Sequence, residues 1–153
     1  FEEIETQIDK SIKKLVDNNL LIIKENEVRR PNVNSEEFIE CQALGRIAQR
    51  SIDRFYILML QLWRNEESHI SINELEKKCR KISKNLEARH SWLMPEFSEK
   101  WTFDLFINHL IEAKFVKKDE KGFVYPLNIT KRIEDDFKTF ITPEWLEELF
   151  KLE

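Results

Sequence analysis

Glycine and proline are scarce in this chain, whose 153 residues include two glycines and four prolines. So few glycines cannot form a glycine-rich loop around a phosphate group. They also leave no flexible linker. Because both residue types interrupt regular structure, their scarcity favours helices over sheets.

Residues that commonly carry chemistry are also sparse. The three histidines stand at unrelated positions, and no H-E-x-x-H, C-x-x-C or other cluster of metal ligands occurs. None of the serines lies in the strand–turn–helix context of a hydrolase nucleophile. The sequence therefore predicts no catalytic residue, no metal and no cofactor in this chain.

Cysteines and long apolar runs are few. Cys79 lies on an apolar helix stripe, far in sequence from Cys41, which predicts a buried free thiol rather than a disulfide or a metal ligand. Reduced thiols are typical of a cytoplasmic protein. The most apolar run, Phe55–Trp63, is far short of the ~20 residues that a membrane-spanning helix needs.

Composition predicts a globular chain, with 41% hydrophobic and 35% charged residues. Its length suits one domain, or two small ones that share a core. A net charge of −4 gives no general reason to expect nucleic acid as a partner. The chain begins within a helical pattern at Phe1 rather than at a methionine, which predicts a fragment of a longer protein.

The first segment predicts a helix followed by a β-hairpin. Apolar residues at helical spacing extend over Phe1–Asn18, and two short apolar runs then flank the charged turn Lys24–Glu27. The loop Arg30–Ser35 is a possible boundary, with Ser35 as the N-cap of the next helix. We expect one unit at residues 1–34 and a second at 35–153.

A long helix is predicted from residue 36 to Trp63. Its apolar residues fit one helix or two abutting ones, with Gly45 as a weak point. The run Phe55–Leu62 is apolar nearly all round, which is typical of a central buried helix. A polar loop, Asn65–Ser68, follows.

The next helix has a clear start and two contrasting faces. Ser71 and Glu74 fit a capping box, and Ile70 with Leu75 fits a hydrophobic staple. The apolar stripe consists of Ile72, Leu75, Cys79, Ile82 and Leu86. The opposite face carries Lys77, Lys78, Arg80, Lys81 and Lys84, either as a binding surface for anionic groups or as a solvated face shared with Glu74, Glu76 and Glu87.

Pro95 should end that helix, because proline disfavours helical backbone in the residue before it. A second amphipathic helix follows from Phe103 to Phe115, and Trp101 and Leu105 widen its stripe, which predicts burial on more than one side. Gly122 in a charged turn between apolar pairs predicts a β-hairpin.

Two further helices are expected near the C-terminus. Thr130 is the expected N-cap of a short helix that extends through Phe140. Thr142 followed by Pro143 marks the start of the last helix. The apolar face of that helix comprises Trp145, Leu146, Leu149 and Phe150.

Together these patterns predict a mainly α fold with short β-hairpins in a winged-helix-like arrangement. The end of the first helix and its hairpin resemble the segment from Ile107 onward, which suggests two winged-helix-like units. The similarity could come from duplication, or from a helix–hairpin arrangement that unrelated segments commonly adopt. A DNA-binding module is one functional alternative. However, its reading helix, Lys100–Lys114, would expose Asp104 and Glu112 rather than a basic stripe, so nucleic acid is not the expected partner.

The stretch from Leu44 to Val124 resembles the C-terminal region of bacterial glycerol-3-phosphate 1-O-acyltransferases of the large, membrane-associated type. The likeness is carried by Leu44-Gly45-Arg46, Arg54-Phe55-Tyr56-Ile57, Ser71-Ile72-Asn73-Glu74-Leu75-Glu76, Leu86, His90, Pro95-Glu96-Phe97, Lys100 and the helix Phe103–Val116 with its hairpin. The catalytic signature of that family is a histidine followed, five positions later, by an aspartate. Here the positions five after His69, His90 and His109 are Glu74, Pro95 and Lys114, so the signature is absent.

The resemblance implies a non-catalytic accessory domain of an enzyme that moves an acyl chain from acyl-CoA or acyl carrier protein to the 1-hydroxyl of glycerol 3-phosphate. An upstream histidine would deprotonate that hydroxyl. The expected partners are the catalytic domain of the same polypeptide and an anionic membrane surface, with the chain in the cytoplasm or at the cytoplasmic face of the membrane. The candidate lipid or partner surface consists of Lys77, Lys78, Lys81, Lys84 and Arg89. A protein-interaction module without an attached enzyme is the remaining alternative.

Overall fold

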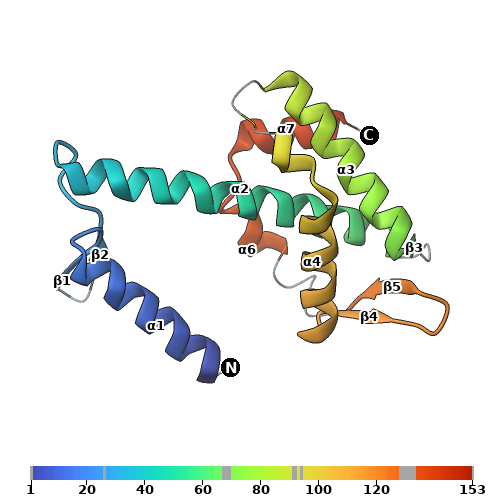
Figure 1. Ribbon diagram of the computed structural model, residues 1–153, viewed down its shortest axis with the longest axis horizontal. Helices are drawn as coiled ribbons and strands as arrows, with labels where there is room; N and C mark the ends of the chain where they lie inside the picture. The colour runs from blue at the N-terminus through green and yellow to red at the C-terminus, as the bar shows by residue number, and fades with distance from the viewer. Residues whose placement is uncertain are drawn as a thin grey trace. The chain divides into compact units, whose positions relative to one another are not determined.

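The computed structural model describes residues 2–25, 27–66, 70–90, 93, 95–127 and 134–152. Contacts divide the chain into two units, Phe1–Gln49 and Arg50–Glu153. One helix, α2 (Glu36–Arg64), runs through this division without interruption at Gly45 (Figure 1). The mainly α fold with short hairpins is confirmed, and the division between residues 34 and 35 stays a prediction.

The first unit contains the predicted helix and hairpin. Helix α1 (Glu2–Asp17) leads into β1 (Ile22–Lys24) and β2 (Glu27–Arg29), which pair antiparallel. Ser35 is the N-cap of α2, because its Oγ accepts a hydrogen bond from the Phe38 N–H at 3.2 Å. Most other side chains of this unit are exposed, and Leu20 is its buried large apolar residue among those described.

The second unit holds the hydrophobic core. The segment Tyr56–Leu62 of α2 is buried, as the apolar run predicted. Helices α3 (Ile72–Arg89) and α4 (Lys100–Glu112) contact each other, and the 3-10 turn η1 (Pro95–Ser98) between them lies against α3. Cys79 is a buried free thiol, as predicted, and burial raises its pKa.

The capping box of α3 is present as predicted. Ser71 Oγ accepts a hydrogen bond from the Glu74 N–H at 3.3 Å, and Glu74 Oε2 accepts one from the Ser71 N–H at 3.1 Å. These bonds satisfy two backbone donors that the helix itself cannot pair. Burial of Ile70 and Leu75 agrees with the expected hydrophobic staple. The helix ends at Arg89, before Pro95.

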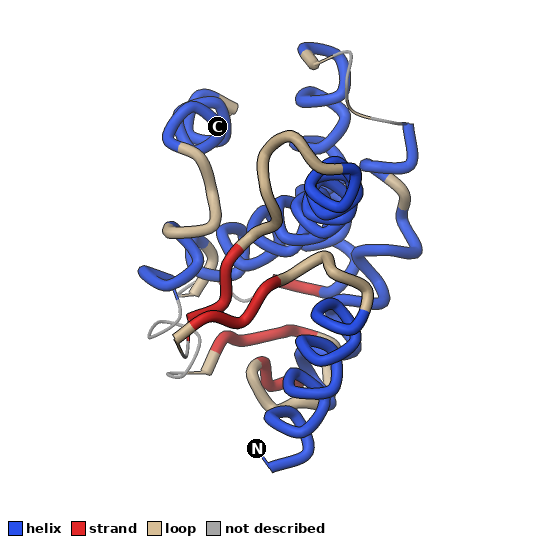
Figure 2. Tube along the Cα trace, turned by 90° about the vertical axis from the view of Figure 1, so that its left-hand side faces the viewer, coloured by secondary structure: helices blue, strands red, loops and turns tan. Residues whose placement is uncertain are grey.

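A three-stranded sheet joins the start of α3 to the second hairpin. Strands β4 (Val116–Lys118) and β5 (Phe123–Pro126) pair antiparallel, and β3 (Ile70–Ser71) adds to β5, which gives the order β3-β5-β4 (Figure 2). At the turn, Gly122 has a φ of 84°, a value that glycine adopts readily. The order helix, strand, two helices and two strands is the one expected of a winged helix, and that assignment stays a prediction.

The helix that precedes each hairpin ends in the same type of backbone turn. Asn19 and Lys114 have φ values of 58° and 60°, the left-handed conformation common just after a helix. The next N–H groups, of Leu20 and Phe115, then donate to carbonyls five residues back at 2.8 and 2.9 Å. The two segments with similar sequences, at the ends of α1 and α4, thus share the same helix C-terminal conformation.

Two short helices complete the second unit. Helix α6 (Glu134–Lys138) lies within the predicted segment, and its expected cap, Thr130, is outside the described residues. Helix α7 (Pro143–Lys151) starts as predicted, because the Thr142 hydroxyl accepts from the Trp145 N–H at 3.3 Å. Trp145 and Leu149 are buried. Phe150, predicted on the same apolar face, is 52% exposed and lies beside the Arg64 guanidinium instead.

Candidate functional site

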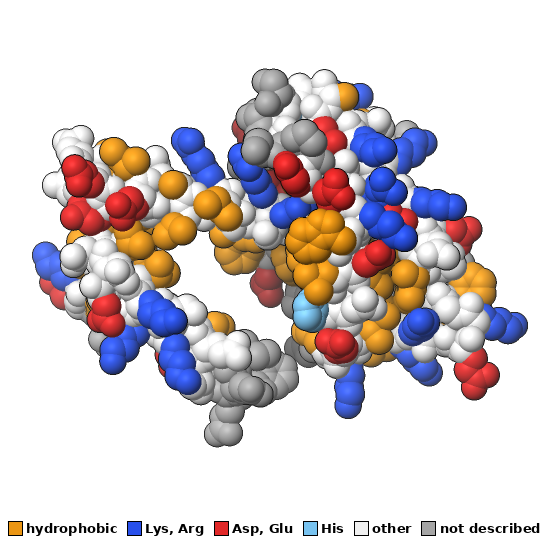
Figure 3. Space-filling view, in the orientation of Figure 1, with side chains coloured by type: hydrophobic (Ala, Val, Ile, Leu, Met, Phe, Trp, Pro, Cys, Tyr) orange, Lys and Arg blue, Asp and Glu red, His pale blue; other side chains and the backbone are white. Residues whose placement is uncertain are grey.

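The predicted basic surface lies on the exposed face of α3. Lys and Arg side chains gather over this helix in the space-filling view (Figure 3). Lys77, Lys81 and Lys84 are exposed and form no ion pair within the part of the chain that the structure describes. Together with Arg80 and Asn85 they line a shallow depression of about 300 Å³. We call Lys77, Lys81 and Lys84 the α3 basic face.

The other two predicted cations have protein partners. Lys78 Nζ donates to Asn65 Oδ1 at 2.7 Å, so it points toward the end of α2. Arg89 Nη1 lies 3.1 Å from Glu148 Oε2 on α7. The hydrogen bond from Arg89 lowers the pKa of Glu148, because it favours the charged carboxylate. The structure therefore places three of the five predicted residues on one open face of α3, while Arg89 pairs with α7.

Two of the three acidic residues of α3 have structural partners, and the third, Glu74, is exposed and interacts electrostatically with Lys77. Glu76, which the sequence suggested is solvated, is only 4% exposed and pairs with Arg80 at 3.3 Å. Glu87 is half-buried and accepts hydrogen bonds from Ser98. Glu74 is occupied by the capping box. Glu76 and Glu87 are therefore held by structural partners, and Lys81 and Lys84 face solvent.

The outward face of α4 is apolar and acidic. Trp101 is 64% exposed and Leu105 42% exposed, so the prediction that both are buried is wrong. Their spacing of one helical turn places them side by side, and hydrophobic side chains reach the surface over α4 (Figure 3). Glu112 is also exposed and pairs with His109 at 3.5 Å. A helix with this face lacks the basic stripe that DNA recognition requires.

The first unit exposes a large set of apolar side chains. They come from α1, the hairpin, the following loop and the N-terminal half of α2. Their members are Ile8, Ile22, Ile23, Val28, Val33, Ile39, Leu44 and Ile47. We call this set the unit 1 apolar surface. Single exposed apolar residues are ordinary, whereas a contiguous apolar patch is typical of an interaction site.

The described histidines occupy structural or surface positions. His90 follows the last residue of α3, where its N–H donates to the Leu86 carbonyl, and its ring lies 5.6 Å from the ring of Trp145. His90 is therefore the C-cap of α3. His109 is on the exposed side of α4, and His69 lies outside the described residues. No group of three or more potential metal ligands comes together within the described parts of the chain.

A family model described as the glycerol-3-phosphate acyltransferase C-terminal region matches residues 1–119. The chain belongs to this family. The match begins upstream of the resemblance noticed in the sequence, and it includes α1 and the first hairpin. The helix-and-hairpin unit is therefore part of the family region.

Curated relatives agree with this assignment. Glycerol-3-phosphate acyltransferase of Pseudomonas fluorescens SBW25 is 30% identical over 122 residues, which cover 80% of this chain and 14% of the relative. The enzymes of Pseudomonas savastanoi pv. phaseolicola and Pseudomonas aeruginosa PAO1 are each 28% identical, over 80% of the chain and 15% of the relative. The chain thus spans about one seventh of the relatives' length. No solved structure matches it.

This acyltransferase C-terminal region has no helix, among those described, that is long and apolar enough to cross a membrane.

The residues of the α3 basic face could be predicted from their spacing in the sequence alone. Sequence reasoning missed the exposure of Trp101, since periodicity marks an apolar stripe but not whether a neighbour covers it. It also gave no indication that Gln61 and Arg64 line a cavity near the end of α2. The available signal was a single amide within an apolar run.

Proposed function

We propose that this chain is a non-catalytic accessory region of a glycerol-3-phosphate acyltransferase and packs against the catalytic domain of the same polypeptide. The unit 1 apolar surface is the observation that carries this proposal. Apolar area removed from water stabilises association by roughly 25 cal/mol per Å² before the costs of ordering. Side chains such as Ile39 and Ile47 therefore favour a protein partner over permanent exposure to water.

The parent enzyme would carry out its chemistry upstream of this region. It would transfer an acyl chain from acyl-CoA or acyl carrier protein to the 1-hydroxyl of glycerol 3-phosphate. The His-x-x-x-x-Asp signature is absent from this sequence, and His90 serves as a helix terminus. Within the parent, this chain would stabilise the catalytic unit or orient it.

The α3 basic face supports a second contact, with an anionic membrane surface. Each lysine near such a surface contributes about 1 kcal/mol of attraction, and an exposed row of lysines without paired carboxylates suits that role. We place this contact at the cytoplasmic face of the membrane. It would help to position the parent enzyme beside its lipid product.

A binding experiment tests the accessory role. The 153-residue chain is titrated into a glycerol-3-phosphate acyltransferase, such as that of Pseudomonas fluorescens, from which the matching C-terminal segment has been removed. We expect saturable binding and recovery of acyl transfer. Ile39→Glu should weaken binding by about tenfold or more, because a charge buried without a partner is costly.

The matched control is Gln42→Glu, which adds the same charge to the same helix at an exposed polar position. Equal affinity for the Ile39 and Gln42 variants would exclude the unit 1 apolar surface as the contact. Acyl transfer by the isolated chain would overturn the proposal as a whole. Tight, salt-dependent binding to random duplex DNA would favour the winged-helix DNA-binding alternative.

A further inference from the structure

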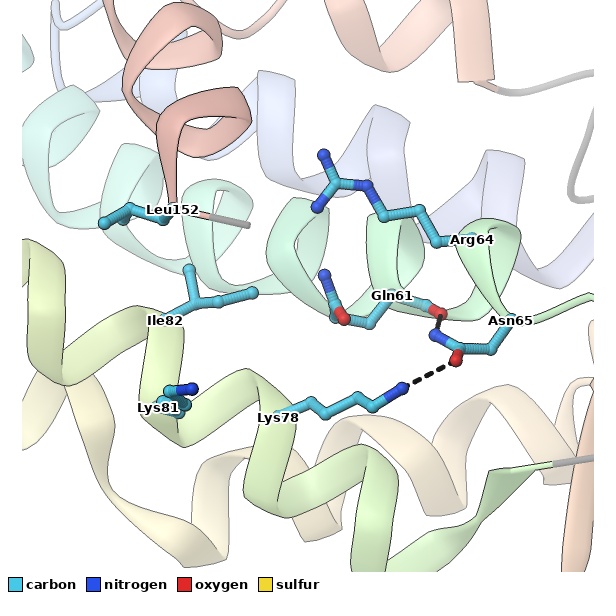
Figure 4. A pocket seen from close by; sticks show the side chains of 7 residues that line it. All are labelled: Gln61, Arg64, Asn65, Lys78, Lys81, Ile82 and Leu152. Carbon is cyan, nitrogen blue, oxygen red and sulfur yellow. Dashed lines mark hydrogen bonds between the residues drawn. The ribbon is translucent and has the colours of Figure 1, made fainter. Parts of the chain in front are cut away.

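A cationic pocket lies in the second unit. It encloses about 320 Å³ between the end of α2, the middle of α3 and the residue after α7 (Figure 4). Gln61, Arg64 and Asn65 line it on the α2 side, and Lys78 and Lys81 on the α3 side. Its size falls at the lower end of the range of small-ligand sites.

Among the residues that the structure describes, three cations and no carboxylate line this pocket. Arg64 comes from α2, while Lys78 and Lys81 come from α3, so the positive charges approach from two elements. Like charges brought together in one hollow repel one another, and an anion between them removes that repulsion. The pocket is therefore complementary in charge to an anionic ligand.

A short chain of hydrogen bonds sets the position of one of these cations. Asn65 Nδ2 donates to the Gln61 carbonyl at 2.7 Å, which fixes the orientation of the Asn65 amide. Asn65 Oδ1 then accepts from Lys78 Nζ, also at 2.7 Å. An ammonium group has three donors, so two remain on Lys78 for a ligand. The ammonium is thus held in place before any ligand arrives.

Gln61 supplies a second, independent sign of a ligand. It is only 6% exposed and stands within the apolar run of α2. Figure 4 shows its side chain extending from α2 into the pocket. Its side-chain amide forms no hydrogen bond with another described residue and is not among the fully buried polar atoms, so it is accessible from the pocket. A ligand oxygen in the pocket would satisfy this amide.

We propose that this pocket binds a phosphate monoester through its dianionic phosphate group. The tetrahedral dianion offers several acceptor oxygens to donors on two sides, and arginine with lysine is a common pairing for phosphate. The volume exceeds that of a bare phosphate ion, and Ile82 and Leu152 form an apolar wall for the organic part of the ester. Lys81 also belongs to the α3 basic face, but Gln61 and Arg64 belong to the pocket alone.

The test uses calorimetric titration of the whole 153-residue chain with three soluble probes. These are butyl phosphate, a monoester dianion, dibutyl phosphate, a diester with one charge, and dihexanoyl phosphatidic acid below its micelle concentration. We expect butyl phosphate to bind about tenfold more tightly than dibutyl phosphate, because the second charge and the additional oxygen engage more donors. Stronger binding of dihexanoyl phosphatidic acid than of butyl phosphate would identify a lipid as the source of the phosphate. Equal or weaker binding would identify a soluble ester.

Matched variants locate the site. Arg64→Gln, Gln61→Leu and Lys81→Gln should each weaken butyl phosphate binding by about tenfold, since each removes a donor to a charged oxygen. The control, Lys77→Gln with Lys84→Gln, removes two charges from the same helix outside the pocket and should leave affinity unchanged. Because Lys81 is exposed, its variant retains the fold even if the substitutions of Gln61 or Arg64 do not.

No binding of butyl phosphate to the wild-type chain at millimolar concentration would overturn the proposal. Equal losses in the pocket variants and the Lys77/Lys84 control would do the same, because they would show general charge attraction only. The accessory role is tested separately by Ile39→Glu, which should weaken binding of the acyltransferase and leave butyl phosphate binding intact. Failure of either proposal can therefore be told from failure of the other.

Discussion

Glu87 on α3 accepts two hydrogen bonds from Ser98 at the end of η1, from the backbone N–H at 2.7 Å and from Oγ at 3.0 Å. Ser98 is buried, so loss of the carboxylate would leave both donors without a partner. We expect Glu87→Ala to lower the free energy of unfolding by about 1.5–3 kcal/mol, measured by urea denaturation. Glu120→Ala, at an exposed turn position, should change it by less than about 0.5 kcal/mol. Similar losses of unfolding free energy in both variants would contradict a specific stabilising role for the Glu87–Ser98 hydrogen bonds.

Asp119 should make the second hairpin sensitive to acid. Burial raises its pKa, but hydrogen bonds from the Phe123 N–H, the Tyr125 hydroxyl and the Lys121 N–H outweigh burial and lower the pKa below its ordinary value. A lowered folded-state pKa stabilises the fold at neutral pH, and this contribution is lost as the pH falls through that pKa.

Tyr125→Phe removes one of these hydrogen bonds, so the pKa of Asp119 should rise toward its ordinary value. Titration of the side-chain carboxyl carbon by NMR measures this change. In Asp119→Asn, the part of the acid-induced loss of stability that comes from this residue should disappear. A Tyr125→Phe chain with an unchanged Asp119 titration would show that the hydroxyl does not act on the carboxylate.

Truncation of two tryptophans should change stability by very different amounts. Trp145 is buried against Phe97 and His90, and Trp145→Ala should lower the free energy of unfolding by about 3–5 kcal/mol. Trp101 is mostly exposed, and Trp101→Ala should change it by less than about 0.5 kcal/mol. Urea denaturation followed by circular dichroism compares the two. A large loss for Trp101→Ala would restore the prediction that α4 is buried on this side.

Vesicle sedimentation tests the α3 basic face. The chain should partition onto phosphatidylglycerol vesicles at low salt and dissociate as the salt concentration rises, because salt screens exposed charges. Lys77→Gln with Lys84→Gln should weaken partitioning by roughly fivefold for each lysine. The control is Lys10→Gln with Lys13→Gln, which removes two charges from α1. Equal partitioning of both double variants would remove the membrane contact from the proposed function.

Local features of the fold could be predicted because they depend on neighbouring residues. The Ser71–Glu74 capping box, the end of α3 before Pro95 and the turn at Gly122 each follow from a few adjacent side chains. The Thr142–Pro143 start of α7 is of the same kind. In each case the backbone chemistry leaves few alternatives.

Features that depend on contacts between elements could not be predicted. The helical spacing of α3 places Arg80 one turn from Glu76, but it gives no sign that Glu76 is buried. It also gives no sign that Glu87 reaches Ser98, since that contact depends on how η1 packs against α3. Trp101 fits the apolar stripe of α4, but nothing among the described residues covers it. The pocket is a similar case, because Arg64 and Lys81 stand far apart in sequence and meet only when α2 and α3 pack.

Helix α2 is exposed to solvent in its N-terminal half and buried near its C-terminal end. Residues 42–48 are all exposed, whereas Tyr56–Leu62 are all buried. Local opening is easy where few side chains are packed and rare within a core. Amide hydrogens along this one helix should therefore exchange with deuterium quickly before Gln49 and slowly after Phe55. The change in exchange rate along this continuous helix would mark where the cooperatively folded part of the chain begins.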